Sequence, residues 1–120
     1  MLHTFVVVLC VIVLVTGRDI NQAGLKFIKK QEGFSAFFYD DLPDGSVKSI
    51  GYGHACHVRD CSNIHPPITR AQGEALLLQD LVEYQNCVQS HCDVDNNKFA
   101  ALVSFTFNLG CGNFRRCGRR

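Results

Sequence analysis

Residues 31–54 read QEGFSAFFYDDLPDGSVKSIGYGH, and this segment contains the polar side chains of the chain that are best suited to chemistry. The carboxyl of Glu32 ends an amphipathic helical segment, and a second carboxyl, Asp41, follows nine residues later at a turn. The hydroxyl of Ser49 opens the next apolar segment. Two acids and a hydroxyl around one cleft are the groups that hydrolysis of a glycosidic bond requires.

The two carboxyls have different surroundings, which suits them to different tasks. Glu32 has Ile28 and Phe34 nearby in sequence, and burial beside apolar groups raises the pKa of a carboxyl and keeps it protonated. A protonated acid can deliver the proton that a glycosidic oxygen needs in order to leave. Asp41 lies before a turn, a wetter place that suits an ionised acid. Its neighbour Asp40 competes for this role, and the spacing from Tyr39 favours Asp41.

The ordered motifs resemble the catalytic signature of phage-type lysozymes, the bacteriophage T4 lysozyme-like family (glycoside hydrolase family 24). That family has a helix ending in Glu-Gly, then Tyr-x-Asp, a turn, Thr-Ile-Gly-x-Gly-His, a long helix and a later Phe-Asn-x-Gly. The resemblance covers roughly residues 24–114. The matching segments are Glu32-Gly33, Tyr39-Asp40-Asp41, Ile50-Gly51-Tyr52-Gly53-His54 and Phe107-Asn108-Leu109-Gly110.

The resemblance implies an α+β fold, with a small lobe built on a short β-sheet, a mainly helical larger lobe, and a long helix that joins them. It implies cleavage of the β-1,4 bond between N-acetylmuramic acid and N-acetylglucosamine in bacterial peptidoglycan, with chitin as a lesser candidate substrate, and it implies no cofactor. Glu32 would be the general acid, and Asp41, helped by Ser49, would position the attacking water. The residues placed along the substrate groove are Tyr39, Gly51, Tyr52 and His54, of which His54 is interpreted as a hydrogen-bonding residue behind the strand.

The chain departs from the family pattern in two ways. Ser49 stands where the family usually has threonine, which keeps the hydroxyl and loses a methyl group. The family also continues with further helices after Phe-Asn-x-Gly, whereas this sequence reaches Arg120 ten residues after Gly110. The second departure leaves open a non-catalytic module that binds wall glycan without cutting it, or a sequence that is not the whole protein.

Residues 1–17 are predicted to be a signal peptide. Phe5 to Val15 is an unbroken run of eleven apolar residues, which fits a signal-peptide core and is too short for a membrane span. Val15 and Gly17 are small enough for a cleavage site, and the alternative is a buried apolar strand or helix. We therefore expect residues 18–120 to form one secreted catalytic domain, which is soluble and monomeric.

Cysteine usage agrees with export. Of seven cysteines, Cys10 belongs to the signal segment, and an even number in a short exported chain suggests three disulfides. The six form three couples that are close in sequence, which favours local pairing: Cys56 with Cys61, Cys87 with Cys92, and Cys111 with Cys117. The rival interpretation is a zinc site, because five possible ligands are crowded together, namely His54, Cys56, His57, Cys61 and His65.

The formal net charge is +1, and the charges are unevenly distributed. Four arginines lie in the last six residues, at 115, 116, 119 and 120. Such a basic end favours anionic wall polymers, although a solvated terminus explains it as well. No aromatic interleaving or nucleic-acid motif accompanies the arginines, so a nucleic-acid partner is not predicted.

Local signals predict three helices and two strands. Asn21 caps a helix to about residue 31, with Leu25 and Ile28 inward, and Gly33 suits its end. The segments 37–39 and 47–52 are predicted strands around a Pro43-Asp44-Gly45 turn. Thr69-x-x-Gln72 is a capping box for a helix to about residue 88, with Leu77, Leu78, Leu81, Val82 and Val88 on or near one face. Asp95 or Asn96 caps a last helix that ends at Gly110, buries Phe99, Leu102, Val103 and either Phe105 or Thr106, and carries Phe107 and Asn108 as core and hinge-packing residues.

Overall fold

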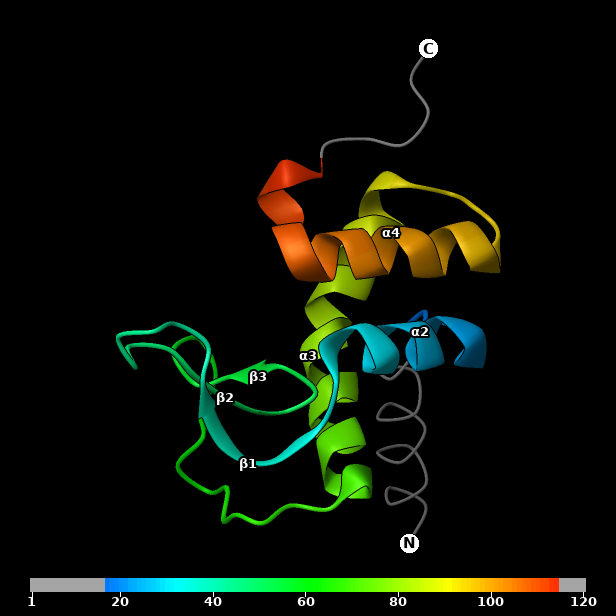
Figure 1. The fold of residues 1–120 in the computed structure, drawn as a ribbon. Coiled ribbons are helices and arrows are strands. Elements are labelled where there is room, and N and C mark those ends of the chain that lie inside the picture. Colours follow the sequence, from blue (N-terminus) through cyan, green and yellow to red (C-terminus); the bar gives the residue numbers. More distant parts are fainter. Residues whose placement is uncertain (1–16, 115–120) are drawn as a thin grey trace, which may run out of the picture.

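The computed structural model describes residues 17–114 and shows a small antiparallel sheet and three α-helices (Figure 1). The predicted α+β class, with a sheet lobe and a helical lobe joined by a long helix, is confirmed. The elements in chain order are α2 (Gln22–Glu32), β1 (Ser35–Asp40), β2 (Lys48–Gly51), β3 (His54–Ala55), α3 (Arg70–His91), α4 (Asn96–Leu109) and the 3₁₀ turn η1 (Cys111–Asn113).

Helix α2 begins and ends where its local signals predict. The side chain of Asn21 accepts a hydrogen bond from the Gly24 amide, and the chain leaves the helix at Gly33, which has a φ of +68° that glycine adopts without steric cost. Leu25 and Ile28 are buried, as expected. This helix therefore ends with Glu32 in its last turn, directed toward the sheet lobe.

The sheet has the order β1-β2-β3, and both strand pairs are antiparallel. Tyr39 lies opposite Ser49 in the first pair, and Ile50 lies opposite His54 in the second. The two-residue strand β3 was not among the predicted elements, because so short a strand is defined by its pairing with β2 and not by a sequence pattern of its own.

Helix α3 joins the two lobes, packing against the sheet with its first half and against α4 with its second half (Figure 1). Its capping box is formed as predicted, with Thr69 and Gln72 exchanging hydrogen bonds. The prediction that Leu78 and Val82 share its buried face is wrong, since these side chains are 43% and 48% exposed. The sheet covers one part of α3 and α4 covers another, so the buried residues of α3 do not form a single apolar stripe.

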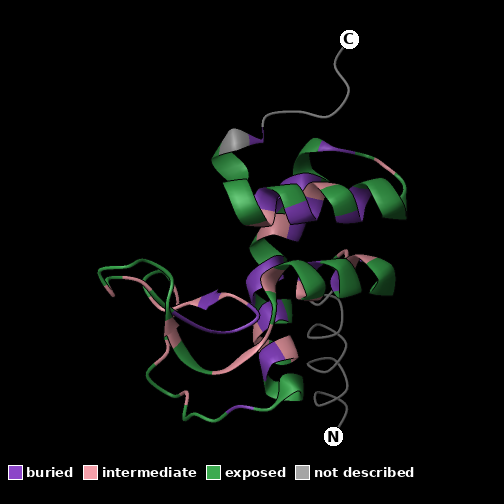
Figure 2. Ribbon diagram, in the orientation of Figure 1, coloured by how far each residue is buried: buried purple, intermediate pink, exposed green. Residues whose placement is uncertain are grey.

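The core lies where α2, α3 and α4 meet, and all three helices carry buried residues there (Figure 2). Asp95 caps α4 and Gly110 follows it, as predicted. Phe99, Val103 and Thr106 are buried, Leu102 is partly buried, and Phe105 is 44% exposed. Helix α2 lies close against α4 at Gly24, where an added methyl group would lie 2.5 Å from the Ala100 Cβ.

The disulfides confirm one predicted pair and contradict the other two. Cys56 is bonded to Cys61, so neither sulfur is a free thiolate ligand as the zinc interpretation requires. The prediction of Cys87 with Cys92 is wrong, because Cys87 is bonded to Cys111 and so connects α3 to the end of α4. Cys92 is also disulfide-bonded. Cys111 is thereby excluded as the partner of Cys117, which lies outside the described residues.

Two other predictions also fall outside the described part of the chain. These are the signal peptide, except for Gly17, and the four terminal arginines. Within residues 17–114, no helix has the length and apolar character that crossing a membrane requires.

Candidate active site

Glu32 lies at the junction of the two lobes, on the wall of a cavity of about 490 Å³. Its carboxyl is partly buried, and this burial raises its pKa above the usual value; the negative charge of Asp41 raises it further. Both effects favour the protonated acid. The residue predicted to be the proton donor therefore lies at the end of α2, on the wall of this cavity, and its role stays a prediction.

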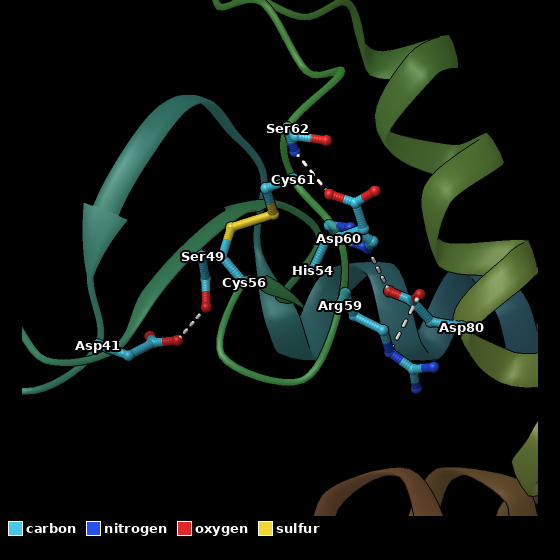
Figure 3. The surroundings of a disulfide bond; sticks show 9 residues. All are labelled: Asp41, Ser49, His54, Cys56, Arg59, Asp60, Cys61, Ser62 and Asp80. Atoms are coloured by element: carbon cyan, nitrogen blue, oxygen red, sulfur yellow. Dashed lines mark hydrogen bonds and ion pairs between the residues drawn. A yellow bond between two sulfur atoms is a disulfide. The ribbon is translucent and has the colours of Figure 1, made fainter.

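Asp41 and Ser49 lie together on the sheet, where the Ser49 hydroxyl donates a hydrogen bond to Asp41 Oδ2 (Figure 3). Asp41 follows directly after β1, and Ser49 belongs to β2 and is fully buried. The competing carboxylate, Asp40, instead pairs with Lys48 Nζ at 2.6 Å on the surface. Asp41, and not Asp40, is therefore the carboxylate that raises the pKa of Glu32 and accepts the hydrogen bond from Ser49.

Tyr39 completes this group. Its pKa is raised by burial first, then by the nearby charges of Asp41 and Glu32, with an opposing contribution from a hydrogen bond with Ser49. Tyr39 also lies opposite Ser49 in the sheet, and Ser49 holds Asp41. The structure thus brings Glu32, Asp41, Ser49 and Tyr39 to one place.

The other three residues predicted to bind substrate lie beneath the surface. Tyr52 is 4% exposed and packs against the Phe34 ring, with 5.2 Å between centroids. Gly51 is buried against α3, where a methyl group would lie 3.3 Å from the Gly73 Cα. His54 is 5% exposed. These three residues are therefore packed in the interior beside the site. Their direct contact with a ligand stays a prediction.

Gly53 is a site residue that the sequence reasoning missed. It has a φ of +78°, and a methyl group in place of its hydrogen would lie 2.8 Å from Glu32 Oε2. Its backbone therefore lies directly against the acid. The signal was present in the Gly-Tyr-Gly-His motif, but the contact itself depends on how the sheet packs against α2.

The cavity beside Glu32 has walls from both lobes. On one side lie Gly53, Ala55 and the following loop, and on the other lie Tyr84 and the end of α4 from Phe107 to Gly110. Phe107 packs edge-on against Tyr84, with centroids 5.5 Å apart. Asn108, which was expected to pack in the core, is exposed and lines the cavity. The cavity can therefore hold a ligand that spans the two lobes.

Behind Gly53, a charged network ties the sheet lobe to α3 (Figure 3). Asp80 is buried and contacts His54 Nδ1 through Oδ2 at 2.8 Å and Arg59 Nε through Oδ1 at 3.4 Å. Arg59 also pairs with Glu83. Within the described residues, no group of His, Cys, Asp and Glu side chains is arranged to hold a metal ion.

Comparison with known proteins gives consistent matches. The model of the family described as phage lysozyme matches residues 29–118. The endolysin of Bacillus phage B103 is 37% identical over 98 residues, which are 78% of this chain and 35% of that protein. Among solved structures, the muramidase domain of SpmX from Asticaccaulis excentricus has 36% identity and a TM-score of 0.66, over 81% of this chain and 63% of that chain.

A second solved structure agrees with the first. The endolysin of Escherichia coli phage FAHEc1 has 31% identity and a TM-score of 0.67, over 79% of this chain and 60% of that chain. This chain spans about a third of the length of the curated relatives it matches, 35% and 37%.

Proposed function

We propose that this chain, which belongs to the phage lysozyme family, hydrolyses the β-1,4 glycosidic bonds of bacterial peptidoglycan. The observation that carries the proposal is a pair of unlike carboxyls: Glu32 lies on the cavity wall, and Asp41 is close enough for its charge to raise the pKa of Glu32. Glu32 is partly buried with a raised pKa, and Asp41 is held by the Ser49 hydroxyl. The muramidase domain and the endolysins that resemble this chain support the same substrate class.

The proposed mechanism has two proton transfers, one from Glu32 to the leaving oxygen and one from the attacking water to Asp41. Glu32, protonated because its charged form loses solvation, gives its proton to the glycosidic oxygen as that oxygen leaves. Asp41 orients a water molecule for attack on the anomeric carbon and receives its proton. Ser49 fixes Asp41 Oδ2, so the carboxylate keeps one orientation. The products are two glycan ends, one of them a new reducing end.

We further propose that the protein is exported. The apolar run from Phe5 to Val15 supports a signal peptide, and the disulfides at Cys56–Cys61 and Cys87–Cys111 suit an oxidising compartment. Lysis of bacteria outside the producing cell, for defence or for digestion, is the activity that follows. We also propose that the exported protein acts as a monomer.

The test uses oxidised, folded protein and purified peptidoglycan, with new reducing ends as the readout. Wild type should release them steadily. Glu32→Gln, which keeps the shape of the side chain and removes the proton, should be slower by at least ~10²-fold. Wall binding without reducing ends from wild type would support the non-catalytic glycan-binding alternative. Near-normal release by Glu32→Gln would refute the assignment of the acid.

A further inference from the structure

Arg59 lies on the wall of the same cavity as Glu32, although it has no part in the proposed reaction of Glu32 and Asp41. Its loop is closed by the Cys56–Cys61 disulfide, and its amide donates a hydrogen bond to the Ala55 carbonyl at 2.9 Å. Both constraints hold Arg59 directly after β3. Its side chain is 26% exposed and extends across to α3.

On α3, Arg59 meets two carboxylates of different burial. Asp80 is 6% exposed in its side chain, and Glu83 is 57% exposed. Asp80 uses one oxygen for Arg59 and the other for His54, so both of its oxygens have partners. Loss of Arg59 would leave a buried carboxylate oxygen without its cation, which is costly in a protein interior.

His54 is joined by one peptide bond to Gly53, which lies beside Glu32. It pairs with Ile50 in the sheet, and it directly follows Gly53, whose backbone lies against Glu32 Oε2. The contacts therefore form a continuous path from Arg59 through Asp80 and His54 to the backbone beside Glu32.

We infer that Arg59 is a positioning residue: acting through Asp80 and His54, it holds the Gly53 backbone against the Glu32 carboxyl and excludes water from it. The inference rests on the proposed function of Glu32 as the acid. It concerns the packing around that acid, because Arg59 itself is already engaged by two carboxylates.

The direction in which the pKa of Glu32 changes when Arg59 is replaced distinguishes this positioning role from a direct effect of the Arg59 charge. Removing a cation near Glu32 makes its surroundings more negative, which by itself raises the pKa of the carboxyl. Loosening Gly53 admits water, which lowers it. The ionisable side chains that surround the acid and remain in place are Tyr39, Asp41, His57, Asp80 and Tyr84.

The experiment is an NMR titration of the Glu32 carboxyl carbon in the intact, oxidised protein, with Arg59→Met compared with wild type. Arg59→Met keeps an unbranched side chain and removes the charge. We expect the pKa of Glu32 to fall by about half a unit to one unit, a fraction of what full burial produces. The alkaline limb of the pH–rate profile should move to lower pH by the same amount. An unchanged or raised pKa in the folded variant overturns the inference.

Two further variants complete the design. Arg59→Lys keeps the charge and loses the planar guanidinium that contacts Asp80 and Glu83 together, so we expect a smaller fall in the pKa of Glu32. An unchanged pKa in Arg59→Lys also overturns the inference. This variant decides the matter if Arg59→Met does not fold. Arg70→Met removes a cation of α3, the helix that Arg59 contacts; Arg70 lies over the Phe34 ring, and its loss should leave the Glu32 titration unchanged. If wild type releases no reducing ends, the proposed function fails, while the titration still decides the role of Arg59.

Discussion

At the scale of single residues, the central feature is an acid whose surroundings penalise its charged form. The pKa of Glu32 is raised by burial and then by Asp41. A carboxyl whose pKa is higher in the folded state contributes stability that is fully present below its unfolded value and is lost as pH rises through the folded value. Above its unfolded-state pKa, the Glu32 carboxyl therefore makes the folded protein less stable than a neutral side chain at this position would.

Glu32→Gln should consequently stabilise the protein while it removes activity. We expect the melting temperature at pH 7 to rise by about 2–4 °C, the equivalent of ~0.5 kcal/mol, because ~1 kcal/mol corresponds to about 4–8 °C in a domain of this size and solvent screens the partly exposed carboxyl. At pH 3 both side chains are neutral, so the difference should vanish. Thermal melts followed by circular dichroism at the two pH values check this. A lower melting temperature for the variant at pH 7 would contradict the electrostatic account.

Gly53→Ala tests the contact between the backbone and the acid. The new methyl group would lie 2.8 Å from Glu32 Oε2, so the carboxyl must move. We expect at least a ~10-fold loss in the rate of reducing-end release, because displacement of a positioned acid is costly. The protein should remain folded.

Gly45→Ala is the matched control for Gly53→Ala. Gly45 has a φ of +69°, close to the +78° of Gly53, so both variants carry a backbone penalty of about 1–2 kcal/mol. A methyl group at Gly45 meets only ordinary contacts, at 3.7 Å from Asp40. Equal activity losses in the two variants would show that backbone strain, not contact with Glu32, is responsible.

At the scale of elements, the capping box of α3 fixes the end of the helix that supports the sheet. Thr69→Ala removes the hydrogen bond to the Gln72 amide. It should lower stability by ~1 kcal/mol and the melting temperature by about 5 °C. Thr69→Ser keeps the hydroxyl and should stay within a degree or two of wild type. A loss of the same size in both variants would exclude the cap as the cause.

The starts of the helices were predictable because caps are local, whereas α3 continues to His91, beyond its predicted end at about residue 88. Asn21, Thr69 and Asp95 each bind an amide three residues ahead, so sequence alone identifies them. Strand β3 and the outward side chains Leu78 and Val82 were not predictable, since they depend on which neighbour covers each part of the sheet and of α3.

The site divides in the same way. Glu32, Asp41 and Ser49 were predicted from their chemistry and their order in the motif, and the structure supports the hydrogen bond between Asp41 and Ser49. The supporting contacts of Gly53 and Arg59 were not found, because each joins segments that are distant in sequence. His54 and Asp80, for example, are 26 positions apart.

At the scale of the whole molecule, the disulfides Cys87–Cys111 and Cys56–Cys61 should contribute differently to stability and to activity. Cys87–Cys111 spans 24 positions, and Cys56–Cys61 spans 5. The chain-entropy model gives about 3 kcal/mol for the longer loop and about 2 kcal/mol for the shorter one. Double substitution by alanine at Cys87 and Cys111 should therefore lower the free energy of unfolding more, as measured in urea.

Activity should follow the opposite order. The loop closed by Cys56–Cys61 carries His57, Val58 and Arg59, which line the cavity beside Glu32. Its double-alanine variant should lose more activity at a temperature where both variants are folded. If the Cys87–Cys111 variant lost more activity there, the loop would not be a wall of the working site.

The most direct test of the whole account identifies the bond that is cut. Purified peptidoglycan is digested with the oxidised protein, and the fragments are reduced and analysed by mass spectrometry. Two unlike carboxyls acting on the muramic side of the β-1,4 bond predict fragments that end in reduced N-acetylmuramic acid. Fragments that end in reduced N-acetylglucosamine, cleaved peptide stems, or an undigested wall would contradict it.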